Sequence, residues 1–284
     1  MSADRRAFVV GGLASTLAPT GASAATRPRR VVSLNACLDA MLVHLADRSQ
    51  IAALSHYARE DHSSTVAAQA KTLPFIWESA EEVIALRPDL VLASKHSALA
   101  TRNALTRLHV PIERFAVPRS IDESLFQVTR VAGLLGQVER GRALKIKIEA
   151  AIAAAAPLPR GRPIKALIYQ PNGFAAGPGT LVDEMMERAG FDNVARRYGL
   201  KTWGNVPLEQ LLADPPEVLL VGEPARGARS WADRVMTHPA LQSVAGQMET
   251  ARLPEKLLYC GGPVLIETAG ALAMAHRAVR GNAA

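Results

Sequence analysis

The sequence contains few cysteines and few aromatic residues. Its 284 residues include only two cysteines, Cys37 and Cys260, and Phe, Trp and Tyr together make up 5%. Two cysteines cannot build a disulfide-rich scaffold, so the chain has to be stabilised by an apolar core, for which the 49% hydrophobic content suffices. Because aromatic residues are so scarce, the position of each one is informative.

Common enzyme motifs are absent as well. The chain has no GxSxG, GxxxxGK[ST] or HExxH sequence, and "AAGPGT" has too few glycines for a dinucleotide fingerprint. Cys37 has no histidine at a spacing that supports a nucleophile pair, and His56 and His62 lack a third metal ligand. The net charge is +7, but no dense Lys/Arg run occurs. We therefore expect no enzyme, no cofactor, no metal site and no nucleic-acid partner.

Residues 1–24 have the features of a cleaved export signal. They combine an arginine pair in "DRRAF", a modest apolar stretch and the small residues "ASA" before "RPRR". The arginine pair resembles a twin-arginine signal, although a Sec signal with a basic start looks similar, so both routes stay open. A membrane anchor is disfavoured because the apolar stretch is short and interrupted by glycine and proline.

One sequence unit occurs twice, as "SAEEVIALRPDLVLAS" (79–94) and "PLEQLLADPPEVLLVGEP" (207–224). The copies align without a gap and pair Glu81 with Glu209. Each copy predicts a short helix, a proline that ends it, and a continuous apolar strand of the kind that is buried on both faces of a parallel sheet. Helix, proline and buried strand recur in many α/β proteins, so this pattern alone could be generic.

The order of the other elements favours a true duplication. A strand, a polar loop and a capped helix start at residue 29 and again at 164–190, and further strands are expected at "QIAALS", "IERFAV" and "KLLYC". Ser120 and Glu123 predict a capping box at the start of a helical connection. We therefore predict an α/β protein with two Rossmann-like lobes, each with a central parallel sheet, joined by a long helix and with a ligand cleft between them. The expected boundaries are an N-terminal lobe at 25–118, linking helices at 119–157 and a C-terminal lobe at 158–284.

Ligands of parallel sheets bind beyond the carboxyl ends of the strands, so the residues that follow each predicted strand are the candidate site. They are Asn35, Cys37, Tyr57, Lys95 and His96 in the first lobe, and Phe174, Arg226, Arg229 and Cys260 in the second. The cationic residues among them are expected at the cleft rim, where they could bind anionic oxygens; the alternative is solvated loop charge.

These features together resemble the Fe/B12 periplasmic-binding protein family. The resemblance covers residues 29 to 280, and "ALRPDLVLA" is its most specific part. It implies a periplasmic protein that captures a metal chelate, namely vitamin B12, a ferric siderophore or haem, and delivers it to an ABC permease dimer in the inner membrane. It also implies that Glu81 and Glu209, one on each lobe, dock on the two-fold permease. The alternative is that both are ordinary solvated glutamates at helix starts.

The aromatic residues give a slight preference for a corrinoid. Trp203 stands six residues before Glu209, as the cleft tryptophan of the family's vitamin B12 binder does, and Phe75 takes the equivalent place before Glu81, with Trp77 as a possible substitute. Tyr57 resembles a cleft tyrosine, but "CGGPV" near Cys260 departs from the B12 pattern. The aromatic side chains could instead belong to the core. A secreted α/β enzyme that uses the same cleft is the alternative function.

The two cysteines are expected at the floor of this cleft. Cys37 follows the first strand and Cys260 follows "KLLY", so the two thiols should face each other from opposite lobes. We predict that they are not bonded, because a bond there would hold the lobes shut against a ligand as wide as a corrin ring. The alternative is that each is a small buried apolar residue in its own lobe.

Overall fold

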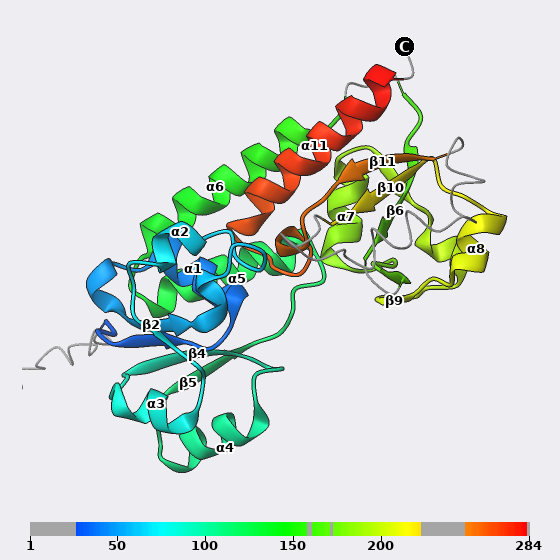
Figure 1. The fold of residues 1–284 in the computed structure, drawn as a ribbon. Coiled ribbons are helices and arrows are strands. Elements are labelled where there is room, and N and C mark those ends of the chain that lie inside the picture. The colour runs from blue at the N-terminus through cyan, green and yellow to red at the C-terminus, as the bar shows by residue number, and fades with distance from the viewer. Residues whose placement is uncertain (1–26, 158–160, 171–172, 223–247, 283–284) are drawn as a thin grey trace, which may run out of the picture.

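The computed structural model describes residues 27–157, 161–170, 173–222 and 248–282 (Figure 1). The predicted export signal at 1–24 lies outside the described residues, as do Arg226 and Arg229. Of the helices in the described ranges, none is long and apolar enough to cross a membrane.

The first lobe contains a five-stranded parallel sheet in the order β3-β2-β1-β4-β5. Its strands are β1 (Val31–Ser33), β2 (Ile51–Ser55), β3 (Phe75–Ile76), β4 (Leu90–Ser94) and β5 (Ile112–Phe115). The strands predicted at "QIAALS" and "IERFAV" are therefore confirmed. Helices cover both faces of the sheet: α1 (Ala36–Leu45), α2 (Ala67–Ala70), α3 (Ala80–Ala85) and α4 (Leu99–Arg107) (Figure 1). Two short 3-10 helices, η1 (Arg48–Gln50) and η2 (His56–Arg59), flank β2.

Burial on both faces explains the apolar runs of the strands. In β4, Leu90 and Leu92 belong to the main core, whereas Val91 and Ala93 pack with Val83 of α3 and other residues of a second apolar cluster. All five residues of β4 are buried. The continuous apolar pattern in the sequence is therefore the pattern of a strand between two helical layers.

The second lobe contains a four-stranded parallel sheet in the order β11-β10-β6-β8. Its strands are β6 (Ile164–Tyr169), β8 (Phe191–Asn193), β10 (Val218–Val221) and β11 (Glu249–Arg252), and β7 (Phe174–Ala175) pairs with β9 (Gly204–Asn205) in a small antiparallel ribbon. The helical elements are α7 (Leu181–Arg188), η4 (Val194–Tyr198), α8 (Leu208–Ala213), η6 (Glu255–Leu257) and α11 (Val264–Asn282). Both copies of the repeated unit thus fold as a helix followed by a buried strand, α3-β4 and α8-β10.

The strand predicted at "KLLYC" is wrong. The last described strand is β11, and the segment after it forms the 3-10 helix η6, with Pro254 at its N-cap. Proline has no N–H to donate to a sheet ladder, so the strand ends before it. A short apolar run does not by itself distinguish a strand from a helical turn.

Two helices, α5 (Ile121–Leu134) and α6 (Val138–Ala155), connect the lobes. Ser120 Oγ accepts the Glu123 N–H at 3.1 Å, as predicted, but the Glu123 carboxylate accepts the Arg119 N–H at 2.7 Å, one residue before the cap. Gly141 permits close packing of α6 on α5, because a Cβ at this position would lie 2.4 Å from the Ala132 Cβ. Helix α11 lies beside α6 and runs in the same direction (Figure 1).

One apolar core runs through both lobes. It contains buried side chains from the first sheet, the linking helices, the second sheet and the last helix, such as Leu92, Val128, Ile148, Ile168 and Leu272. A shared core of this kind resists large hinge motions, since opening the lobes would expose apolar surface to water.

Candidate ligand-binding site

The carboxyl ends of the parallel strands bring most of the predicted N-lobe residues to one edge. After β1, Asn35 caps α1, and its side-chain oxygen accepts the Cys37 N–H at 3.0 Å. After β2, η2 begins with His56 and Tyr57. After β4, Lys95 and His96 are exposed, as expected for residues at a rim. The sites predicted at Arg226 and Arg229 lie outside the described residues.

Four rings form what we call the N-lobe wall: His56, Tyr57, Phe75 and Trp77. His56 lies 3.8 Å from the Tyr57 ring centroid and stacks on Trp77 at 4.4 Å, and Phe75 meets Trp77 edge-on at 6.1 Å. Trp77 is 66% exposed and Tyr57 43%, which is unusual for such large apolar side chains. The Arg59 guanidinium lies over the Phe75 ring at 4.5 Å, so the wall also carries a cation.

Three rings form the C-lobe wall: Phe174, Trp203 and Tyr259. Phe174 and Trp203 stack with centroids 5.3 Å apart and planes 9° from parallel, and Tyr259 lies 5.2 Å from Trp203. Trp203 is half-buried and also packs against the main core. It therefore belongs partly to the wall and partly to the core. The small β7–β9 ribbon positions two of the rings, because Phe174 pairs with Asn205 two residues beyond Trp203.

Tyr259 retains its proton at neutral pH. Burial, with a smaller contribution from Glu255, raises the pKa of its phenol to about 12. The side chain therefore presents an aromatic face and a neutral hydroxyl.

Buried acids lie behind the N-lobe wall. The Asp39 carboxylate is fully buried in α1 and accepts hydrogen bonds from the backbone N–H and the hydroxyl of Ser55, the residue before His56. Burial raises the pKa of Asp39 to about 7, although hydrogen bonds from Ser33 and Ser55 oppose the shift. Asp39 does not cap α1, because Asn35 is its N-cap residue.

Glu78 is the second of these acids. Its Oε1 atom lies 3.7 Å from His56 Nδ1, and both atoms are buried without a hydrogen-bond partner. Burial, followed by repulsion from Glu82, raises the pKa of Glu78 to about 7. Its backbone has φ 71°, a left-handed conformation that is costly for a residue with a side chain, and the Thr101 hydroxyl donates to its carbonyl at 3.1 Å. Strain of this kind concentrates at functional sites.

The prediction that the cysteines are unbonded is wrong. Cys37 and Cys260 face each other, as predicted, but they form a disulfide with Cα atoms 5.0 Å apart. The expectation failed because it placed the bond across the open cleft. Instead, residues 260–263 leave the C-terminal lobe and dock on α1 and α5, where Gly262 donates its N–H to Ser124 Oγ at 2.6 Å. The bond therefore lies where this segment packs against α1 and α5.

The two glutamates of the repeated unit occupy equivalent places. Glu81 lies in the first turn of α3 and Glu209 in the first turn of α8, and both side chains are exposed. Helix α3 starts with a capping box, in which Ser79 Oγ accepts the Glu82 N–H and the Glu82 carboxylate accepts the N–H groups of Ser79 and Trp77. The cap therefore does not require Glu81.

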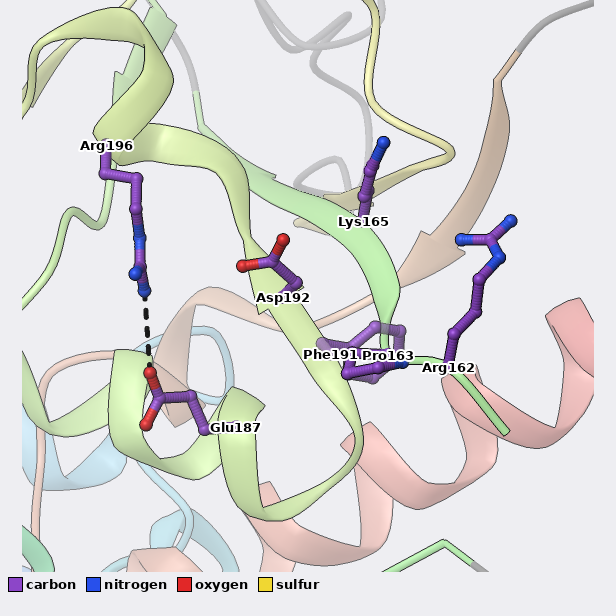
Figure 2. A pocket seen from close by; sticks show the side chains of 7 residues that line it. All are labelled: Arg162, Pro163, Lys165, Glu187, Phe191, Asp192 and Arg196. Carbon is purple, nitrogen blue, oxygen red and sulfur yellow. Dashed lines mark ion pairs between the residues drawn. The ribbon is translucent and has the colours of Figure 1, made fainter. Parts of the chain in front are cut away.

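A hollow in the C-terminal lobe lies away from these walls. It is lined by Arg162, Pro163, Lys165, Glu187, Phe191, Asp192 and Arg196 (Figure 2). These residues surround the amino ends of β6 and β8, whereas the aromatic walls lie toward the carboxyl ends of the strands. Its arginines are paired, Arg196 with Glu187 at 3.5 Å (Figure 2) and Arg162 with Glu217 at 2.7 Å. Both arginines of the hollow are thus paired with carboxylates, and its aromatic ring, Phe191, is buried.

Sequence reasoning gave no role to several residues of this region. His56 was considered as a metal ligand without a third partner, and Arg59, Glu78 and Tyr259 were not singled out. Their clearest sequence signal was proximity to predicted cleft residues, since each lies within two positions of one. In the described part of the chain, no group of three or more His, Cys, Asp or Glu side chains is arranged to hold a metal ion.

Comparison with known proteins gives a consistent family. The model of the periplasmic binding protein family matches residues 31–246. A cobalamin-binding protein of Halobacterium salinarum is 24% identical over 201 residues, which is 69% of this chain, and the aligned region spans only about half (54%) of that relative.

Solved structures agree on the fold. The apo periplasmic heme-binding protein RhuT from Roseiflexus sp. RS-1 is 27% identical, with a TM-score of 0.72 over 87% of this chain and 98% of that one. A periplasmic heme-binding protein from Pseudomonas aeruginosa, 22% identical, has a TM-score of 0.69 over 87% and 92% of the two chains and supports the fold alone. The matched family implies a periplasmic location, and its members bind substrates without catalysing reactions. With a family match over most of its length and two parallel-sheet lobes, the chain belongs to the periplasmic binding protein family.

Proposed function

We propose that the protein is the substrate-binding component of an ABC importer, and that it captures a metal chelate between its lobes and delivers it to a permease dimer in the inner membrane. The alternative of a secreted enzyme is wrong, because the family consists of substrate-binding proteins. The metal belongs to the cargo, and the protein's own residues supply the faces and polar groups around it.

The observation that carries the proposal is the concentration of aromatic side chains at the carboxyl ends of the strands. Six of the Phe, Trp and Tyr residues of an aromatic-poor chain form two walls there, three in each lobe, and His56 joins one of them. Exposed aromatic faces that stack on one another offer a large apolar area to a flat conjugated ligand at a low cost in side-chain entropy.

Among metal chelates, these walls favour a tetrapyrrole, either a corrinoid or haem, over a ferric siderophore. The sequence gives corrinoid a slight preference through Trp203, and the cobalamin-binding relative is consistent with it. Haem is the second candidate, because its carboxylates could pair with cations such as Arg59 and Lys95. Asn35 and the hydroxyl of Tyr57 supply polar groups at the same strand edge.

Ionic strength separates the two tetrapyrroles. Binding of a carboxylate-bearing ligand by Arg59 and Lys95 should weaken as salt rises, because exposed charges are screened. Binding of a corrinoid through its faces and amide side chains should not change with salt concentration. Isothermal titration with haem and with cyanocobalamin at low and high sodium chloride tests the proposal. Saturable binding of at least one of them supports it, and the absence of binding by both would reject the tetrapyrrole assignment.

A further inference from the structure

The Cys37–Cys260 disulfide joins the two lobes at a second point. The chain itself passes between them through α5 and α6, and the disulfide connects residues 223 positions apart in sequence, one at the start of α1 and one just before α11. A second covalent connection restricts how the two lobes can move relative to each other.

The segment that carries Cys260 is tightly packed against the N-terminal lobe. A Cβ on Gly261 would lie 2.5 Å from Ser124 Oγ and 2.9 Å from Pro118 Cγ, and a Cβ on Gly262 would lie 2.7 Å from Met41 Cε. Gly262 has φ 65°, which favours glycine. At these two positions only glycine fits this closely. The disulfide therefore belongs to a fixed contact surface and not to a loose loop.

This contact surface is continuous with both aromatic walls. Tyr259 of the C-lobe wall directly precedes Cys260, and its carbonyl lies 3.9 Å from Cys37 Sγ. On the other side, Asp39 in the same helical turn as Cys37 holds Ser55, the residue before His56 of the N-lobe wall. The bond thus connects Tyr259 of the C-lobe wall, directly beside Cys260, to His56 of the N-lobe wall by way of Asp39 and Ser55.

We propose that the Cys37–Cys260 disulfide determines ligand selectivity by fixing the separation of the two aromatic walls at their base. A fixed separation makes the cleft preformed for a ligand of one thickness. The ligand then binds without a cost for ordering the lobes, and ligands of another thickness are disfavoured. This inference rests on the proposed function, since it concerns how the same cleft discriminates among chelates.

The test compares the wild-type protein with the Cys37→Ser/Cys260→Ser variant. Dissociation constants are measured for haem, which is thin, for cyanocobalamin, which carries a nucleotide below the ring, and for cobinamide, which lacks that nucleotide. We expect the double variant to bind the preferred ligand about tenfold more weakly and the ratio between the best and the worst ligand to fall by a similar factor. An unchanged ratio would overturn the proposal and leave the bond as a stabilising cross-link only.

Two controls address the variant itself. Each single Cys→Ser variant should behave like the double variant, because either one removes the bond. Circular dichroism and thermal unfolding establish whether the variants are folded, since losing a native disulfide lowers stability. If they do not fold, wild-type protein is reduced with dithiothreitol, desalted without oxygen and assayed in their place. In that reduction the disulfide gains two electrons and two protons, and dithiothreitol becomes its cyclic disulfide.

Small-angle X-ray scattering tests the constraint without any ligand. The radius of gyration of oxidised protein should be smaller than that of reduced protein, and the double Cys→Ser variant should match the reduced protein with or without dithiothreitol. If no tetrapyrrole binds, the proposed function fails while this measurement still decides whether the bond restrains the lobes. Identical scattering of the two redox forms would show that it does not.

Discussion

At the scale of single residues, the aromatic side chains differ in what surrounds them. Trp203 is half-buried and stacks on Phe174, whereas Phe126 on α5 is 67% exposed and lies outside both walls. If the walls bind the ligand, truncation of Trp203 should lower the ligand affinity and truncation of Phe126 should not.

We expect Trp203→Ala to weaken ligand binding by about 1 to 3 kcal/mol, because a stacking face is lost from the C-lobe wall. Phe126→Ala is the matched control and should leave the affinity unchanged. Calorimetric titration measures the effect, and thermal unfolding of the same samples measures stability. A strongly destabilised Trp203 variant with intact affinity would show that this residue serves core packing and not ligand binding.

A second residue-scale prediction concerns Asp39. Its pKa is raised in the folded protein to about 7 from 3.8, so between these values the folded state binds more protons than the unfolded state. The free energy of unfolding should therefore fall as pH rises from about 4 to 7. Asp39→Asn removes this group and should flatten the pH dependence by about 2 to 4 kcal/mol over that interval.

Denaturant titrations at several pH values between 4 and 8 measure this effect. Glu78→Gln is the comparison, because the pKa of Glu78 is also raised to about 7, but its side chain is less buried, so its contribution should be smaller. A pH profile of the Asp39→Asn protein that parallels the wild-type profile would show that Asp39 remains charged in the fold.

At the scale of elements, α3 and α8 are equivalent helices that present one exposed glutamate each. We predict that Glu81→Ala/Glu209→Ala abolishes uptake while ligand affinity is retained, because docking on the permease would occur outside the cleft. Glu139→Ala/Glu149→Ala on α6 is the matched control for the loss of two exposed carboxylates. Transport is measured in proteoliposomes or in cells lacking the native protein, and normal uptake by the first variant would refute the docking role.

The sequence predicted the repeated elements well, because their burial is regular. The α3-β4 and α8-β10 units follow from a helical stripe, a proline and an apolar run between two helical layers, and local rules suffice for each. The strand predicted at "KLLYC" was wrong because the burial of this segment follows no regular pattern. Its apolar residues are buried by a 3-10 turn against the core, and no periodicity distinguishes that turn from a short strand.

For the site, the sequence predicted which residues follow the strands, but not how their side chains contact one another. The carboxyl-end rule placed Tyr57, Lys95 and Phe174 beside the expected cleft, but it gave no distances between side chains from different strands. The His56–Glu78 contact depends on the positive φ of Glu78, which a non-glycine sequence does not indicate. The disulfide depends on how residues 260–263 pack against α1 and α5, a contact between segments more than a hundred residues apart.

At the scale of the whole molecule, three features oppose the same motion, the separation of the two lobes. The linking helices, the core that runs through both lobes and the Cys37–Cys260 bond all resist separation of the lobes. A ligand that enters such a cleft meets walls that are already in place, so affinity should depend on the fit of its faces more than on closure of the lobes around it.

We have proposed that the protein is a non-catalytic carrier of a tetrapyrrole metal chelate. Native mass spectrometry of the purified protein, titrated with cobalamin, haem and ferric siderophores, tests it most directly. We predict a saturable one-to-one complex with cobalamin or haem in which the ligand mass is unchanged over time. A complex with a siderophore alone, binding of none of the three, or conversion of the bound ligand to a product would contradict the claim.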